Sequence, residues 1–209
     1  MEENMAILMV DLSGYTALTE THGSASAADL IDQYIKIANS CLVGDCRLHE
    51  RSGDQVMILS PSPDFLLKTA LLIGHKTSHE ENFLEVHGGL HFGKVLKRGD
   101  SYFGSAINLT ARIASQANAG TLCCSSDFVH AITNKFPYKM LRKGMFQFKN
   151  ISEEKEIFEL NIHRGEPYYI DPVCRMLIRN PNHAVPHPFE KQKYFCSTHC
   201  LDIYATIHI

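Results

Sequence analysis

The sequence lacks an apolar run of the roughly 18 residues that a membrane-spanning helix needs, and its first residues are acidic rather than basic. We therefore expect neither a membrane anchor nor a secretory signal. It also lacks an excess of positive charge, because 23 acidic residues outnumber 20 lysines and arginines. The net charge of −3 argues against binding to nucleic acid or to acidic membrane surfaces. Without an anchor or a secretory signal we expect a cytoplasmic protein. Repeats and low-complexity segments are missing too.

The chain does have enough apolar material for one domain of ordinary size and a small appendage. Its 209 residues are 44% hydrophobic and 21% charged, as in soluble globular proteins. After residue 160 the composition shifts toward proline, histidine and cysteine, and residues 163–167 resemble a linker. We predict a first domain over residues 1–163 and a second over residues 164–209.

Hydrophobic periodicity predicts that the first domain is α+β, with one sheet covered by helices. The element order is approximately βαββαβαβαββ. The predicted strands are 5–10, two within 46–60, 86–96, 121–124 and a hairpin over 144–160; the predicted helices are 24–42, 65–75, 105–118 and 127–134.

Two acidic residues follow predicted strands in a way that favours a metal site. Asp11 ends the first strand, and Asp54 lies in the turn before the third. If these strands are neighbours, the two carboxylates converge, and carboxylates are the ligands that Mg²⁺ prefers. Asn108 and Arg112 are four residues apart on a predicted helix and so share a face. An amide suits a ribose oxygen, and a guanidinium suits the charge of a phosphoryl group in transfer.

These residues carry a resemblance to class III adenylate and guanylate cyclases. The segments involved are VDLSGYT (10–16), Gly53-Asp54, HGGLHFG (87–93) and YFGSAINLTAR (102–112). The resemblance implies a ferredoxin-like βαββαβ core in a head-to-tail homodimer, with the sites at the subunit interface. It implies that Asp11 and Asp54 bind two Mg²⁺ or Mn²⁺ ions. By the same resemblance Asn108 orients the ribose and Arg112 stabilises the transition state.

The implied reaction converts ATP or GTP into a 3′,5′-cyclic nucleotide and pyrophosphate. The positions that read the base in this family fall on Glu50 and Ser101, and Lys149 resembles the phosphate-binding lysine. Glu50 can accept hydrogen bonds from guanine N1–H and its amino group, and Ser101 can donate to O6. A register shift of one residue would instead place Asp100 at the second position and favour adenine. A site that does not discriminate is the third alternative.

The last 40 residues contain a second pattern, in which DPVC (171–174) is followed by YFCSTHC (194–200). It resembles the YHS domain, although Arg175 replaces the usual glycine. Three of the seven cysteines, Cys174, Cys196 and Cys200, are candidate ligands for Zn²⁺ or Cu⁺, with either His187 or His199 as a fourth. The alternative is a packed appendage that holds its cysteines without an ion.

Two other functions stay open at this point. One is an inactive, cyclase-like module that binds nucleotide and transmits a signal. The other is a metal-binding protein that uses the first domain as a dimerising scaffold. His87 and His91 are four residues apart in a predicted strand, but Gly88-Gly89 between them indicates close backbone packing rather than metal ligation.

Overall fold

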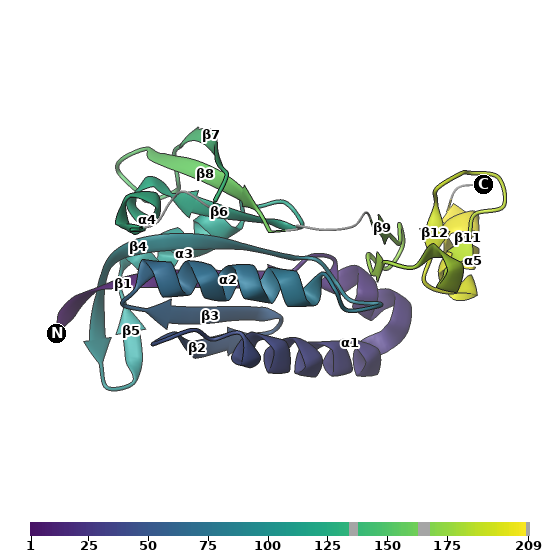
Figure 1. Ribbon diagram of the computed structural model, residues 1–209, viewed down its shortest axis with the longest axis horizontal. Coiled ribbons are helices and arrows are strands. Elements are labelled where there is room, and N and C mark those ends of the chain that lie inside the picture. Colours follow the sequence, from purple (N-terminus) through teal and green to yellow (C-terminus); the bar gives the residue numbers. More distant parts are fainter. Residues whose placement is uncertain (134–137, 163–167, 208–209) are drawn as a thin grey trace.

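The structure is a computed structural model and describes residues 1–133, 138–162 and 168–207. The predicted linker, residues 163–167, and Asn134, the predicted end of a helix, lie outside the described residues. A large unit holds the sheet, and a small C-terminal unit lies beside one end of it (Figure 1).

Eight strands of the described chain form one sheet in the order β2-β3-β1-β4-β6-β8-β7, with β5 paired to β4. The order β2-β3-β1-β4, with one helix after β1 and one after β3, is that of the predicted ferredoxin-like unit. The strands are β1 Glu2–Leu12, β2 Arg47–Ser52, β3 Gln55–Ser60, β4 Val86–Arg98, β5 Ser101–Phe103, β6 Thr121–Ser125, β7 Met140–Phe146 and β8 Lys155–Asn161.

The helices differ from prediction mainly at the start of the first one. They are α1 Tyr15–Ser40, α2 Pro63–Thr77, α3 Ser105–Ala114 and α4 Ser126–Ala131. The start predicted for α1 was wrong by nine residues, because its first two turns bury only Leu18 and so lack periodicity. Gly23, with φ of 82°, separates these turns from the rest of α1. None of the helices described here has both the length and the hydropathy needed to span a bilayer.

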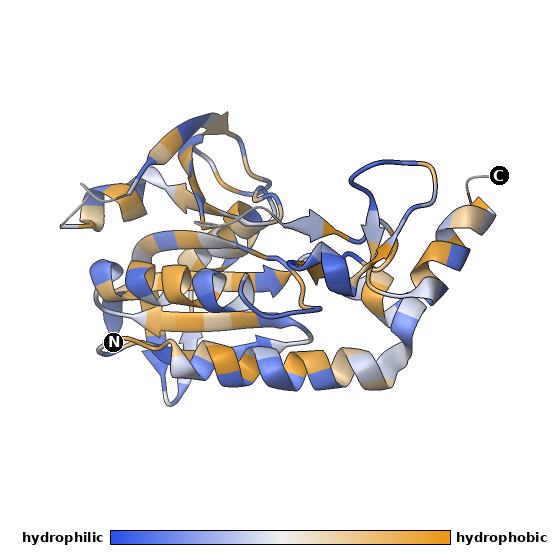
Figure 2. Cartoon of the chain, turned by 45° about the vertical axis from the view of Figure 1, so that its right-hand side comes forward, coloured by the Kyte–Doolittle hydropathy of each residue, from blue (hydrophilic) through white to orange (hydrophobic). Residues whose placement is uncertain are grey.

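Alternation along β1 assigns the two faces of the sheet. Ala6, Leu8 and Val10 pack in the core under α1 and α2. Met5, Ile7 and Met9 belong to a second cluster, which includes residues of α3. Figure 2 shows the corresponding stripes of hydrophobic and hydrophilic residues along α1. The sheet is therefore covered by α1 and α2 on one face and by α3 on the other.

The interpretation of Gly88-Gly89 as a close backbone contact is confirmed. A Cβ atom on Gly89 would lie 2.4 Å from the backbone nitrogen of Ala114, at the end of α3. A Cβ atom on Gly88 would lie 2.4 Å from the carbonyl oxygen of Met9 on β1. These glycines let α3 and β1 approach β4 closely, and so position the helix that carries Asn108.

The C-terminal unit consists of two small hairpins and a helix. Its elements are β9 Tyr169–Ile170, β10 Leu177–Ile178, a 3-10 turn Pro181–His183, β11 Val185–Pro186, β12 Tyr194–Phe195 and α5 Thr198–Ile207. Its small core contains Cys174, Phe195 and Cys200. The backbone N–H of Leu177 donates to the carbonyl of Phe83 at 2.6 Å, which ties this unit to the segment before β4.

Candidate active site

Asp11 and Asp54 meet at the end of β1, so the predicted convergence of their carboxylates is confirmed. Pairing of Val10 with Val56 brings the β2–β3 turn, and with it Asp54, beside the end of β1. Burial, together with the hydrogen bond and negative charge of Asp11, raises the pKa of Asp54 to about 7. The pair is thus a half-buried concentration of negative charge.

Neutral and backbone groups surround this pair. The N–H of Leu12 donates to Asp11 Oδ1 at 3.0 Å. His87 lies directly across from Asp11 on β4, and its Nδ1 is 3.0 Å from Ser13 Oγ. Burial lowers the pKa of His87, although the charge of Asp54 opposes that shift. Sequence reasoning missed this histidine as a neighbour of the aspartates, since only the β1–β4 register places it there.

Asn108 and Arg112 lie on α3, on the same side of the sheet as Asp11. Asp11 follows Met5, Ile7 and Met9 in the alternation of β1, and these face α3. Within the part of the chain that is described, Arg112 Nη1 is buried and has no hydrogen-bond partner. A buried donor without a partner costs free energy, so this guanidinium is suited to an anion from outside the chain.

A β-bulge turns Glu50 toward the same side of the sheet. The β2–β3 pairing shifts from Leu48 with Ile58 to Glu50 with Met57. Without the extra residue Glu50 would pair with Val56 and face the core under α1. Met57 packs in the cluster below α3, so the bulge gives Glu50 the face of the aspartates.

Ser101 begins β5 and is exposed. Its neighbour Tyr102 contacts β2, because the rings of Tyr102 and His49 are 5.1 Å apart and the Arg47 guanidinium lies 5.1 Å from the Tyr102 ring. Glu50 and Ser101, the predicted base-reading residues, are therefore the sequence neighbours of two residues, His49 and Tyr102, whose rings contact each other. Lys149 is exposed in the turn between β7 and β8.

The three cysteines of the C-terminal unit, which we call the tail, lie close together, as their predicted role requires. Cys196 Sγ is 3.5 Å from both Cys174 Sγ and Cys200 Sγ, and none of the three forms a disulfide. Cys196 follows β12 and Cys200 lies in α5, which confirms the predicted strand-to-helix turn. A hydrogen bond from Cys174 lowers the pKa of Cys196 to about 6, whereas burial raises that of Cys200 to about 12.

The fourth member of this cluster is His22, so the predicted choice of His187 or His199 was wrong. His22 Nε2 lies 3.5 Å from Cys196 Sγ. The Nδ1 atom of His187 instead accepts from the N–H groups of Phe189 and Glu190, and His199 is exposed. His22 comes from α1, and no local spacing links it to cysteines more than 150 residues away.

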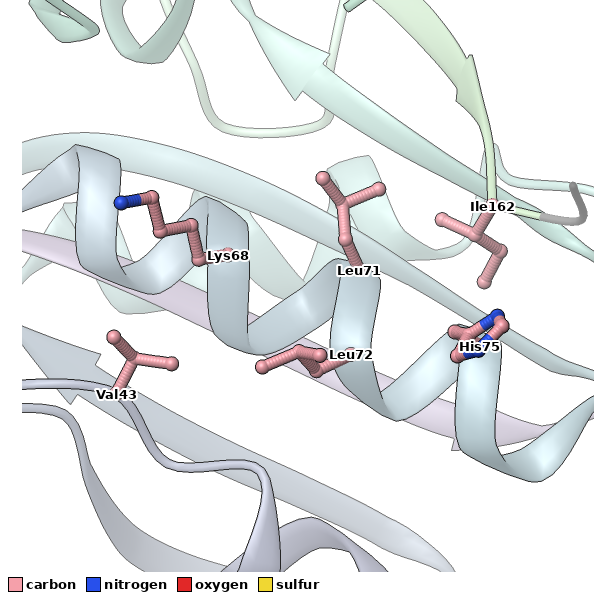
Figure 3. A pocket seen from close by; sticks show the side chains of 6 residues that line it. All are labelled: Val43, Lys68, Leu71, Leu72, His75 and Ile162. Carbon is pink, nitrogen blue, oxygen red and sulfur yellow. The ribbon is translucent and has the colours of Figure 1, made fainter.

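An apolar hollow of about 390 Å³ lies elsewhere, beside α2 (Figure 3). It is lined by Val43, Lys68, Leu71, Leu72, His75 and Ile162. These lining residues include no carboxylate, and α2 covers the face of the sheet opposite to α3. The hollow is therefore separate from the aspartate pair.

Comparison with known proteins supports the cyclase resemblance. No protein-family model matches the chain. An uncharacterized protein of Mycobacterium tuberculosis is 30% identical over 153 residues, covering 72% of this chain and 39% of that protein. An adenylate cyclase of Glutamicibacter nicotianae is 24% identical over 167 residues, covering 79% and 41% respectively. A solved adenylate cyclase structure from Trypanosoma brucei has a TM-score of 0.70 at 18% identity, covering 76% of this chain and 88% of that one.

The chain spans about two fifths of the length of the relatives it matches in sequence. The likeness to solved structures shows that the mixed sheet with its helices has the fold of an adenylate/guanylate cyclase domain, and the sequence likeness to an adenylate cyclase agrees with it.

Proposed function

We propose that the chain is a nucleotide cyclase, which converts ATP or GTP to a 3′,5′-cyclic nucleotide and pyrophosphate as a homodimer. The observation that carries this proposal is the contact between Asp11 and Asp54, on the sheet face that also carries α3. The similarity to an adenylate cyclase over 79% of the chain supports the same reaction class.

Two Mg²⁺ or Mn²⁺ ions fit the aspartate pair on the chemistry of its donors. Burial and the neighbouring Asp11 raise the pKa of Asp54, so a cation at the pair would relieve an unfavourable concentration of negative charge. Hard divalent cations bind carboxylate oxygens and leave positions for phosphate oxygens. When bound, such ions neutralise triphosphate charge and favour ionisation of the attacking ribose hydroxyl. Asp11 and Asp54 would hold them at the end of β1.

Asn108 and Arg112 supply the other half of the proposed site. In this role Asn108 hydrogen-bonds the ribose, and the unpartnered Nη1 of Arg112 stabilises charge on the reacting phosphate. Within one chain, neither side chain hydrogen-bonds to either aspartate among the described residues. We therefore infer that a second copy of the chain contributes its α3 pair to the aspartates of the first.

Exposed apolar side chains support the dimer. Phe103 on β5 is 52% exposed, and Leu141 and Met145 on β7 are 55% and 49% exposed. Large apolar groups left in water favour association with another surface.

Lys149, in the turn that follows β7, is proposed to bind the triphosphate.

The tail is proposed to bind one soft or borderline metal ion, Zn²⁺ or Cu⁺, through Cys174, Cys196 and Cys200. The 3.5 Å distances from Cys196 Sγ to each of the other two sulfur atoms support this role. The buried carboxylate of Asp171 accepts hydrogen bonds from the N–H groups of Val173 and Cys196, at 2.7 Å each. Asp171 thereby holds the two cysteine-bearing loops together.

Turnover of ATP and of GTP, each with Mg²⁺ and with Mn²⁺, tests the cyclase. Cyclic product should form with wild-type protein and not with Asp11→Ala. Tight nucleotide binding without product would instead identify an inactive signalling module. Metal binding without any nucleotide binding would favour the metal-binding alternative.

Mixing two inactive variants tests the shared site. Asp54→Asn and Arg112→Ala should each be inactive alone, and their mixture should regain activity because one interface then has both halves. A mixture of Asp11→Asn with Asp54→Asn is the matched control, since both lack the same half. If wild type is active, two results would contradict the proposed dimer. One is regained activity in the control mixture, and the other is no regained activity in the mixture of Asp54→Asn with Arg112→Ala.

A further inference from the structure

The thiol–histidine cluster joins two parts of the chain that the sequence places far apart. His22 Nε2 lies 3.5 Å from Cys196 Sγ and 3.6 Å from Cys200 Sγ, although 174 and 178 residues separate them in sequence. The four ligand atoms all lie within 4.8 Å of one another. Three of these residues belong to the tail, and His22 belongs to the first two turns of α1.

The spacing of these atoms fits a tetrahedral zinc site. Zinc–sulfur bonds of ~2.3 Å and zinc–nitrogen bonds of ~2.0 Å place neighbouring sulfurs roughly 3.8 Å apart, and sulfur and nitrogen roughly 3.5 Å apart. Cys196 Sγ lies 3.5 Å from each of the other two sulfurs, and His22 Nε2 lies 3.5–3.6 Å from Cys196 Sγ and Cys200 Sγ. The two remaining distances are within 4.8 Å. Three thiolates and one imidazole also form a closed set of four ligands, as in structural zinc sites.

We propose that His22, Cys174, Cys196 and Cys200 together hold one Zn²⁺ ion, and that this ion clamps the tail onto the helical turns that follow Asp11. The imidazole nitrogen favours Zn²⁺ over Cu⁺, because a softer ion is better served by sulfur alone. Zinc here is a cross-link between the two units rather than a centre of chemistry.

Contacts at both ends of the segment 14–22 support the clamp. Gly14, the residue before α1, packs so closely on Arg175 that a Cβ atom would lie 2.4 Å from the Arg175 Cβ. Arg175 follows the ligand Cys174 directly. At the other end His22 precedes Gly23, where α1 changes direction. The tail therefore contacts both ends of the first two turns of α1, which start four residues after Asp11.

A chain of hydrogen bonds that does not involve the zinc ligands also connects the tail to Ser13, in the loop between β1 and α1. The Tyr168 hydroxyl donates to Glu85 Oε1 at 2.7 Å, and the Glu85 carbonyl accepts from the Ser13 N–H at 2.7 Å. Loss of zinc would free His22 and weaken the hold on residues 11–14. This regulatory consequence rests on the proposed cyclase function, whereas the zinc site and the clamp do not.

Metal binding by the full chain tests the ligand set. We expect one Zn²⁺ per chain by elemental analysis, and a Co²⁺-substituted protein with the absorption of a tetrahedral thiolate site. His22→Ala should weaken Zn²⁺ binding by more than ~100-fold and change the Co²⁺ spectrum, since even outer-shell substitutions cost about 10- to 100-fold. His22→Cys should restore tight binding. His199→Ala is the matched control, because its ring lies 6.5 Å from that of His22 but outside the cluster.

Hydrogen–deuterium exchange tests the clamp without reference to catalysis. Removing Zn²⁺ with a chelator should increase exchange in residues 11–22 of the wild type, and adding Zn²⁺ back should reverse it. His22→Ala should show the faster exchange with or without Zn²⁺. Unchanged Zn²⁺ affinity in His22→Ala would overturn the ligand assignment, and zinc-independent exchange in residues 11–22 would overturn the clamp. A protein that passes both tests but forms no cyclic nucleotide would refute the proposed function alone.

Discussion

Glu50 lies directly across from Met57, and not from Val56, because β2 contains one extra residue at this point. The two registers differ by one position, which reverses the face of the sheet to which the Glu50 carboxylate belongs. The bulge thus gives Glu50 the side on which Asp11 and α3 lie.

This placement predicts that Glu50 selects the base. We expect wild type to prefer GTP, because the carboxylate accepts two hydrogen bonds from guanine. Glu50→Lys should lower kcat/KM for GTP relative to ATP by at least ~10-fold, about the effect of one lost charged hydrogen bond. Kinetics with both nucleotides measure the ratio. Glu3→Lys makes the same charge change at the far end of β1 and should leave the ratio unaltered. An unchanged ratio in Glu50→Lys would assign the selection to other residues.

Because Asp11 and Asp54 repel each other, we predict that removing the charge of Asp54 stabilises the metal-free protein but abolishes its activity. The pKa of Asp54 is raised from 3.8 to about 7, so folding favours its protonated form. That contribution is fully present below pH 3.8 and is lost as pH rises through 7. Asp54→Asn should therefore stabilise the metal-free protein at pH 8 by about 1–2 kcal/mol, discounted for partial exposure, while abolishing turnover.

Chemical denaturation in the presence of a chelator measures this effect. Asp29→Asn, an exposed position on α1, removes the same charge from a solvent-exposed site and should change stability by under about 0.5 kcal/mol. If Asp54→Asn destabilised the metal-free protein at pH 8, repulsion within the pair would not be the dominant effect.

His91 predicts a loss of stability on acidification. It is 5% exposed, its Nδ1 lies 2.8 Å from Ser125 Oγ, and burial lowers its pKa from 6.5 to about 4. Because the folded state disfavours the charged form, the contribution is present above pH 6.5 and is lost as pH falls toward 4. The full loss amounts to roughly 3 kcal/mol.

Unfolding of wild type and His91→Gln at several pH values isolates this contribution. The free-energy difference between them should shrink between pH 6.5 and 4. His130→Gln, which makes the same substitution at an exposed position, is the matched control. A constant difference for His91→Gln would mean that His91 does not titrate in this range.

The close contact between Gly89 on β4 and the end of α3 predicts that a side chain at this position displaces α3. Gly89→Ala would force a Cβ atom to within 2.4 Å of the Ala114 backbone and should destabilise the fold by about 2–4 kcal/mol. It should also reduce turnover in the protein that remains folded, because α3 carries Arg112. At Gly99 a Cβ atom meets nothing within 4 Å, so Gly99→Ala should cost only the ~1 kcal/mol of its positive φ. Equal losses in melting experiments would contradict this account.

Much of the first domain follows from local patterns in the sequence. Alternating and helical periodicities predicted its strands and helices in nearly the observed order, since these patterns record which side of each element is buried. The β5 strand was missed, because Ser101–Phe103 is too short for any periodicity. The meeting of Asp11 and Asp54 was predictable because each carboxylate adjoins a buried strand.

What the sequence by itself determined is therefore the element order, the paired aspartates, the shared helix face of Asn108 and Arg112, and the three cysteines. Only the tertiary structure decided that Glu50 faces the aspartates and that His22 completes the thiol cluster. Both depend on contacts between segments distant along the chain, namely a bulged strand pairing and the docking of the tail on α1. Such contacts leave no periodic trace in the residues that make them.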